Sequence, residues 1–171
     1  MNLAQYLRGP YTIFGLSVAA VAGIIDQASK LYLLFVYDLA NNPTRVAPFL
    51  DFVLTRNTGI SYGLFSSDGA LWPFVLLAFK VVAVVVLWAW LAKAEHRFTA
   101  LSLGLIIGGA VGNAIDRAAY GWVMDFVFFH GFGAYSYLRW YVFNLADVAI
   151  VAGVIGLLYE SFAGERAAKA P

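Results

Sequence analysis

Residues 108–127, GGAVGNAIDRAAYGWVMDFV, contain the features that decide the fold of this chain. The stretch begins as an apolar, glycine-rich helix and ends with two aspartates, Asp116 and Asp125, where a membrane segment gives way to water. A third aspartate, Asp147, lies inside the next apolar segment. An ionisable side chain in a membrane segment is costly, and it marks a functional site by default. These three carboxylates are therefore the first candidates for chemistry.

The composition indicates an all-α integral membrane protein. Of the 171 residues, 62% are hydrophobic and 12% are charged, whereas a soluble domain has about 45–50% apolar and about 25% charged residues. We expect one membrane domain over residues 1–171. A net charge of +1 gives no basic surface for nucleic acid. The absence of cysteine excludes a thiol nucleophile, and the two histidines are far apart and form no HExxH motif. We expect no metal and no cofactor.

Four apolar segments of about 20 residues predict transmembrane helices. They cover approximately residues 11–36, 70–92, 98–116 and 142–162. The first is too long for a cleaved signal peptide, and it carries Asp26 and Lys30 at a spacing that lets them pair on one helix face. The two long loops then lie on one side of the membrane. A small excess of Lys and Arg on the other side indicates cytoplasmic termini.

The two long loops have different character. Residues 38–69 contain prolines and glycines that break a helix, and residues 49–55 alternate as in a strand. We expect a small sheet on the bilayer surface there. The aromatic run at 122–143 suits an interfacial anchor, since Trp and Tyr prefer the headgroup level, and it also suits a flap over a lipid-attached substrate.

In this topology, polar residues from several segments gather at one membrane face. Asn144 and Asp147 are three residues apart and share a helix face. The other members of the group, in chain order, are Asp26, Arg56, Asn57, Gly59, Asn113, Asp116, Arg117 and Asp125.

Structural roles explain some of these residues. Asp116 can pair with its neighbour Arg117 and fix the end of a span, and Asp125 can cap a helix or strand end. Asn113 and Asn144 can join helices by hydrogen bonds and orient the carboxylates. Asp147 has apolar neighbours on both sides, so a solvated surface role explains it poorly.

The chemistry that remains is that of a carboxylate pair. The chain has no GxSxG serine, and a metal site of three aspartates would usually recruit histidine. Two nearby carboxylates cannot both ionise easily, so one keeps a proton while the other acts as a base. Such a pair can activate water against a peptide carbonyl and protonate the leaving amine. The residues alone do not select which two of Asp116, Asp125 and Asp147 form the pair.

Five short motifs together resemble the lipoprotein signal peptidase family (signal peptidase II), which are aspartyl proteases of the bacterial inner membrane. They are DQASK at 26–30, RNTGISYGLF at 56–65, GGAVGNAIDR at 108–117, VMDFV at 123–127 and FNLAD at 143–147. All five occur in the family's order and cover essentially the whole chain. Two departures are Ile60-Ser61-Tyr62 in the second motif and a longer aromatic segment at 128–138.

The resemblance implies which residues act and on what substrate. Asp125 and Asp147 match the family's catalytic aspartates, and the supporting residues would be Asp26, Asn57, Gly59, Asn113, Asp116, Arg117 and Asn144. The implied substrate is a prolipoprotein with a diacylglyceryl-modified cysteine, cut just before that cysteine at the extracytoplasmic face and in contact with membrane lipid. The implied fold adds a β-cradle between spans one and two and a short interfacial helix between spans three and four. A globomycin-type inhibitor is expected to bind.

Two other classes of protein remain as alternatives. A proton-coupled carrier also uses membrane carboxylates, but its relay runs through the bilayer, and no inverted repeat is visible. A non-catalytic assembly factor would tolerate asparagine at Asp125 or Asp147, which a catalytic pair would not.

Overall fold

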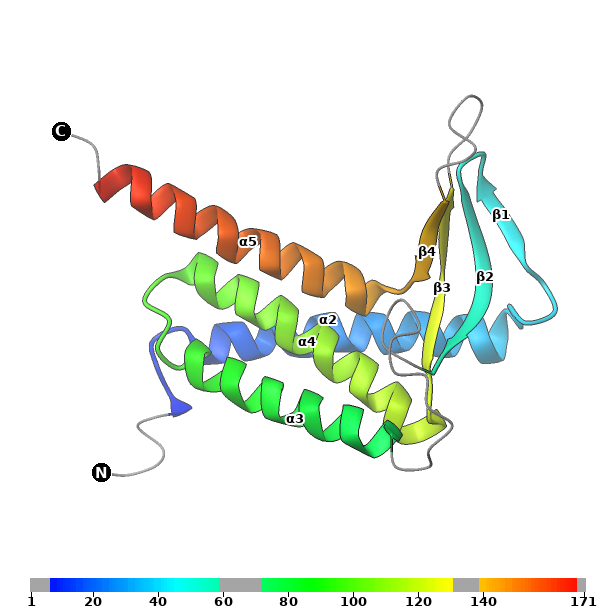
Figure 1. The fold of residues 1–171 in the computed structure, drawn as a ribbon, viewed down its shortest axis with the longest axis horizontal. Helices are drawn as coiled ribbons and strands as arrows, with labels where there is room; N and C mark the ends of the chain where they lie inside the picture. The colour runs from blue at the N-terminus through cyan, green and yellow to red at the C-terminus, as the bar shows by residue number, and fades with distance from the viewer. Residues whose placement is uncertain (1–6, 59–71, 131–138, 169–171) are drawn as a thin grey trace.

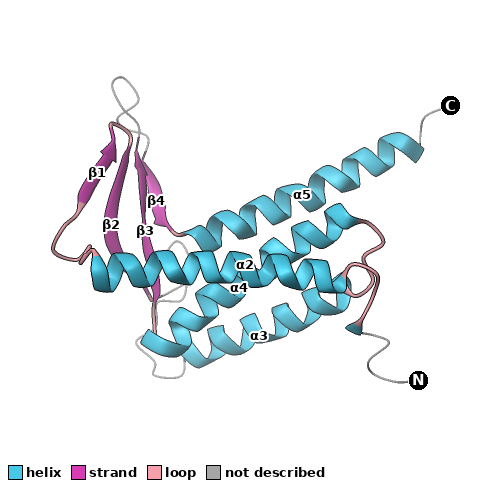
Figure 2. Cartoon of the chain, turned by 180° about the vertical axis from the view of Figure 1, so that it is seen from behind, coloured by secondary structure: helices cyan, strands magenta, loops and turns pink. Residues whose placement is uncertain are grey.

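The computed structural model describes residues 7–58, 72–130 and 139–168, and it consists of a helix bundle with a sheet at one end (Figures 1 and 2). Gly59 and the Ile60-Ser61-Tyr62 departure lie outside the described residues. In chain order the elements are α2 (Thr12–Leu31), the π-helix η1 (Tyr32–Val36), β1 (Thr44–Ala47), β2 (Leu50–Asn57), α3 (Trp72–Leu91), α4 (Arg97–Tyr120), β3 (Val123–His130), β4 (Arg139–Phe143) and α5 (Leu145–Ala168).

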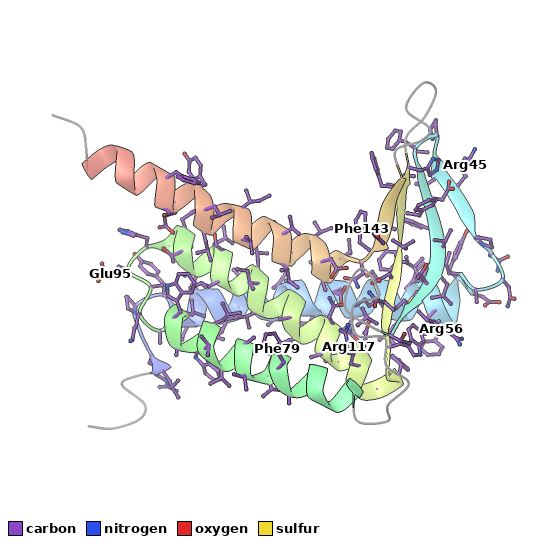
Figure 3. All side chains as sticks on the ribbon, viewed as in Figure 1. Arg45, Arg56, Phe79, Glu95, Arg117 and Phe143 are labelled. Atoms are coloured by element: carbon purple, nitrogen blue, oxygen red, sulfur yellow. The ribbon has the colours of Figure 1, made fainter. Side chains whose placement is uncertain are left out.

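Three of the predicted spans meet the length and apolarity that a bilayer requires. They are Thr12–Val36, Arg97–Tyr120 and Leu145–Phe162. Among the described residues α3 offers a shorter apolar stretch, Val81–Leu91. The span predicted at residues 70–92, and with it the count of four, therefore stays a prediction. Large apolar side chains cover the outside of the helices, as Phe79 on α3 illustrates with 73% exposure (Figure 3). Such a surface is favourable in lipid and costly in water.

Helix α4 is central, because it packs against α2, α3 and α5. Glycines make these contacts close: a Cβ on Gly108 would lie 2.5 Å from the Ala19 carbonyl oxygen of α2, and a Cβ on Gly109 would overlap the Ala146 carbonyl oxygen of α5. This is the small-residue packing that brings membrane helices into backbone contact. The glycine-rich stretch therefore sets the positions of α2 and α5 against α4.

The sheet is antiparallel, with the strand order β1-β2-β3-β4. Its first two strands confirm the strand pattern expected in the first loop. Its other two strands come from the second loop, so the sheet joins both long loops rather than one. One face packs against η1 and the turn that follows it, where Leu33 and Leu39 meet Met124 and Phe126.

The described residues between α4 and α5 form strands and no helix, so the expected interfacial helix stays a prediction. Helix α4 continues to Tyr120, and Gly121, with φ of 78°, ends it. The chain then enters β3, while α5 begins at Leu145 rather than at residue 142. Residues 123–127 are all buried, and a short run that is buried on both faces has no alternation that would mark it as a strand. Residues 131–138, which include most of the longer aromatic segment, lie outside the described residues.

Candidate active site

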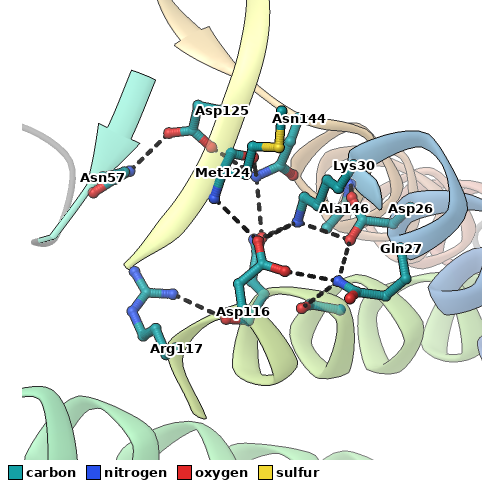
Figure 4. A network of polar contacts seen from close by, with 12 residues as sticks. Asp26, Gln27, Lys30, Asn57, Asp116, Arg117, Met124, Asp125, Asn144 and Ala146 are labelled. Carbon is teal, nitrogen blue, oxygen red and sulfur yellow. Dashed lines mark hydrogen bonds and ion pairs between the residues drawn. The ribbon is translucent and has the colours of Figure 1, made fainter. Parts of the chain in front are cut away.

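The predicted site residues lie where α2, α4 and α5 meet the sheet (Figure 4). The structure brings together Asp26, Asn57, Asn113, Asp116, Arg117, Asp125, Asn144 and Asp147. Gly59 is the one predicted site residue outside the described ranges.

Asn144 and Asp147 form a capping box at the start of α5. The Asn144 side-chain oxygen accepts a hydrogen bond from the Asp147 backbone N–H at 3.0 Å. In return, Asp147 Oδ2 accepts one from the Asn144 backbone N–H at 3.2 Å. This reciprocal pair satisfies N–H groups that a helix N-terminus leaves free, with Asn and Asp in place of the usual Ser/Thr and Glu. The local sequence NLAD thus fixes Asp147 at the first turn.

Asn144 also reaches the other candidate aspartate. Its side-chain Nδ2 donates to Asp125 Oδ1 at 2.7 Å, to Asn113 Oδ1 at 3.0 Å and to the Met124 carbonyl at 3.2 Å. Strand β4, which pairs with β3, leads directly into Asn144, so the strand pairing places this residue beside Asp125. One fully buried asparagine therefore contacts both Asp125 and Asp147.

Strands β2 and β3 position Asp125. Thr55 faces Asp125 across the strand pair, and Asn57 faces Val123, which makes Asn57 the diagonal neighbour of Asp125. Diagonal neighbours lie on the same face of a sheet and within reach of each other. Asn57 Nδ2 donates to Asp125 Oδ2 at 3.0 Å. Both carboxylate oxygens of Asp125 thus accept an amide N–H, one from each side.

The environment of Asp125 favours its protonated form. The pKa of the Asp125 carboxyl is raised from 3.8 to about 6, mainly by burial and further by the nearby charge of Asp147. The hydrogen bonds from Asn57 and Asn144 and the charge of Lys30 act in the opposite direction and lower this pKa. Withdrawal from water disfavours the charged form, and so does a second carboxylate nearby. This is the environment of a carboxyl group that can still hold a proton near neutral pH.

Asp116 is held in a different way from the other two aspartates. Its Oδ2 pairs with Lys30 Nζ at 2.8 Å and accepts from the Met124 backbone N–H at 3.0 Å. Its Oδ1 accepts from Gln27 Nε2 at 2.8 Å. The expected pairing with the adjacent Arg117 is wrong, because Lys30 of α2 takes that place. An ammonium, an amide and a backbone N–H bind this carboxylate, so it ties α2 and β3 to α4.

Asp26 on α2 lies beside these residues and pairs with Lys30 at 2.8 Å. Its other oxygen accepts from the Ala146 backbone N–H at 2.9 Å, so a residue of α2 caps the first turn of α5. Gly112 makes room for this contact, since a Cβ there would lie 2.6 Å from Asp26 Oδ2.

The two arginines near the site have separate surroundings. Arg117 donates to the Asn113 carbonyl at 3.4 Å, and its charge acts on Asp116, Asp125 and Asp147. Arg56 is exposed and stacks over the Trp122 ring at 5.2 Å.

Sequence reasoning gave no role in the site to Lys30 or Gln27. Lys30 is 3% exposed and contacts Asp26, Asp116 and Asn113, while Gln27 links Asp116 to the Gly112 carbonyl. The i, i+4 spacing of Asp26 and Lys30 was a signal for one of these contacts. The partners on α4 are far away in the sequence and give no local signal.

Comparisons with known proteins agree on one family. A model of the family described as Signal peptidase (SPase) II matches residues 18–163. A lipoprotein signal peptidase of Nitrobacter hamburgensis is 60% identical over 156 residues, which cover 90% of this chain and 95% of the relative. One of Rhodopseudomonas palustris is 51% identical over 158 residues, which cover 92% of this chain and 96% of the relative.

Solved structures share the fold. A bacterial membrane enzyme solved by the in meso method at 2.3 Å superposes with a TM-score of 0.74 at 24% identity, and the match covers 92% of each chain. A second structure of this description, at 1.9 Å, gives a TM-score of 0.72 at 25% identity and covers 90% of this chain and 96% of the other. Since the family model spans most of the chain and the relatives match it along nearly their whole length, the chain belongs to the signal peptidase II family of membrane proteases.

Proposed function

We propose that this protein is an aspartyl endopeptidase that removes the signal peptide of diacylglyceryl-modified prolipoproteins and cuts just before the lipidated cysteine. The observation that carries the proposal is the contact of Asn144 with both Asp125 and Asp147. The relatives named lipoprotein signal peptidase support the substrate class. In this proposal Asp125 and Asp147 form the pair, and Asp116 supports the structure through its bonds to Lys30, Gln27 and Met124.

The proposed mechanism follows from the two environments. Asp147 takes a proton from a water molecule, and the water oxygen forms a bond to the carbonyl carbon of the peptide. Asp125, whose raised pKa lets it keep a proton, donates a hydrogen bond to the carbonyl oxygen. The C–N bond then breaks, and the nitrogen of the lipidated cysteine leaves with a proton from the pair.

The proposed orientation places the reaction at the extracytoplasmic face of the bacterial inner membrane. The first residues of α2 and the last turns of α5 lie at the end of the bundle opposite the sheet (Figure 1). With the termini in the cytoplasm, Asp125 and Asp147 would lie near the extracytoplasmic surface of the inner membrane. A lipidated cysteine has its acyl chains in the bilayer, so its peptide bond lies at the same level. Membrane lipid and a globomycin-type inhibitor remain expected partners of this site.

A cleavage assay tests the substrate class. Purified protein in lipid is expected to cleave a prolipoprotein that carries diacylglycerol and to leave the unlipidated form uncut, because the acyl chains hold the peptide at the depth of the site. The products are separated on a gel, and the new N-terminus is identified by mass spectrometry. Equal cleavage of both forms would reject the lipid requirement. No cleavage of either by folded protein would reject the peptidase assignment and favour the carrier, to be tested by ion flux.

The pH dependence of this activity follows from the pKa of Asp125. The proposed acid must carry its proton, so kcat/KM for the lipidated substrate is expected to fall as the pH rises through about 6. The N–H donor of Asn57 stabilises the ionised form of Asp125 and lowers its pKa. The variant Asn57→Ala lacks this donor, so the pKa of Asp125 should rise. The basic limb of the profile is therefore expected to move to higher pH in this variant. A move to lower pH, or an unchanged limb, would contradict the role of Asp125 as the acid.

A further inference from the structure

Lys30 makes one contact that charge pairing does not explain. Its ammonium group is buried and pairs with Asp26 and Asp116, each at 2.8 Å. Its third contact is to a neutral group, the side-chain oxygen of Asn113, at 3.1 Å. The two carboxylates also have other donors, from the Ala146 and Met124 backbones. The contact with Asn113 therefore points to a role beyond neutralising Asp26 and Asp116.

An ammonium group fixes the direction of an amide that it contacts. It has donors only, so Asn113 must turn its oxygen, and not its NH₂ group, toward Lys30. The same oxygen accepts from Asn144 Nδ2 at 3.0 Å. The NH₂ group of Asn113 then faces Asp147 Oδ1, to which it donates at 2.9 Å. The opposite orientation would set NH₂ against the ammonium and against Asn144, and would turn an oxygen toward a carboxylate.

The orientation of the Asn113 amide in turn determines that of Asn144, which contacts Asp125. Because the Asn113 oxygen accepts from the Asn144 NH₂ group, the Asn144 oxygen is left for the backbone N–H of Asp147. The same NH₂ group donates to Asp125 Oδ1 at 2.7 Å. Donors and acceptors thus run in one direction, from Lys30 through the two asparagines to both aspartates.

We propose that Lys30 is a positioning residue whose ammonium group fixes the orientation of the Asn113 and Asn144 amides, so that each donates an N–H to one carboxylate of the Asp125–Asp147 pair. This rests on the proposed function. The charged groups around the chain of contacts are Asp26 on α2, Asp116 and Arg117 on α4, Asp125 on β3 and Asp147 on α5. Lys30 acts through the asparagines and does not touch the substrate.

The test uses a Lys30 variant that keeps the net charge of the unaltered cluster. Lys30→Met alone would leave two buried carboxylates without a cation, and such a change can unfold the protein. The double variant Asp26→Asn/Lys30→Met removes one anion and the cation together, so the net charge of the cluster is unchanged. Asp26→Asn alone is its reference, because asparagine still offers an oxygen to the Ala146 N–H. Thermal unfolding in detergent shows that both variants are folded.

Loss of Lys30 is expected to act on the chemical step. Relative to Asp26→Asn, the double variant should lose about 10- to 100-fold in kcat, the range typical of groups that orient catalytic ligands, with KM changed less than about threefold. Adding Asn113→Ala to both proteins should make this loss largely disappear, because the residue through which Lys30 acts is gone. Unchanged kcat, or an equal loss with and without Asn113, would overturn the proposal in favour of a purely structural lysine.

A spectroscopic readout needs no substrate. In ¹⁵N-labelled protein, the Asn113 side-chain amide is expected to show one set of signals and slow hydrogen exchange in Asp26→Asn, and faster exchange or two orientations in the double variant. One protected orientation in both proteins would overturn the proposal. The proposed function and the role of Lys30 are therefore tested by different measurements. Absence of cleavage by the unaltered protein would reject the proposed function, while the amide signals decide the role of Lys30.

Discussion

Asp125→Asn is expected to lower kcat/KM for a lipidated prolipoprotein by about 10³- to 10⁴-fold, with the fold retained. Asparagine has the shape of aspartate but cannot carry or release the proton. Both Asp125 oxygens accept an N–H, from Asn57 and from Asn144, so an NH₂ group at this position meets one of these donors. The mismatch costs about 1–3 kcal/mol of stability. A thermal unfolding curve in detergent must therefore accompany the kinetics.

Asp147→Asn is expected to cause a loss of similar size for the same reasons. Its Oδ1 accepts from Asn113 and its Oδ2 from the Asn144 backbone, so the new NH₂ group again faces a donor. If the two aspartates act as one unit, the double variant should be hardly less active than either single variant. Multiplying losses would mean that the two carboxylates act in separate ways.

Asp51→Asn is the matched control for these variants. Asp51 lies on β2 of the same sheet and is bound by Arg45 and His130, both at 3.2 Å. Arg45 is largely exposed, and exposed ion pairs contribute little, at most about 1 kcal/mol. Activity is therefore expected to stay within about twofold.

If Asp125→Asn remained active and Asp116→Asn did not, the catalytic pair would be Asp116 and Asp147.

The sequence predicted the helices well because their signal is local. A span needs about 20 apolar residues, and this requirement is visible without knowledge of the partners. The ends of the helices were less accurate. Helix α4 continues to Tyr120, beyond the predicted end at residue 116, because Gly121 ends it and not the charges of Asp116 and Arg117. The pairing of β3 with β2 was not predicted, since it joins segments that are separated by two helices in the chain.

The candidate site divides in the same way into local and distant contacts. The Asp26–Lys30 pair and the shared face of Asn144 and Asp147 follow from spacing, and the structure has both. The partner of Asp116 does not follow from spacing, because Lys30 is on another helix and the adjacent Arg117 was the nearer choice in the sequence. Motifs therefore indicated the candidate residues, while the packing of helices and strands determined which of them touch.

Gly109→Ala is expected to lower kcat by at least about 10²-fold, although the residue is buried between helices and has no side chain that could take part in the reaction. A Cβ on Gly109 would overlap the Ala146 backbone carbonyl and lie 2.8 Å from Ile150 Cγ1. A backbone carbonyl cannot rotate away as a side chain can, and an adjacent face of α4 already packs against α2 through Gly108. The first turn of α5 must therefore move, and Asp147 moves with it.

The expected cost of Gly109→Ala in stability is about 1–3 kcal/mol, the usual range for overpacking. Gly23→Ala on α2 is the matched control, because its Cβ would lie 3.6 Å from the Gly108 carbonyl oxygen, an ordinary contact. Alanine also favours a helix over glycine by about 1 kcal/mol, so this variant should be as stable as the unaltered protein or more so. Both variants are measured by thermal unfolding and by kcat for the lipidated substrate.

Full activity of a folded Gly109→Ala protein would mean that the position of Asp147 does not depend on the close contact between α4 and α5. The glycines would then serve helix assembly alone. A loss of kcat in Gly109→Ala but not in Gly23→Ala would show that helix packing holds the aspartate where the reaction needs it.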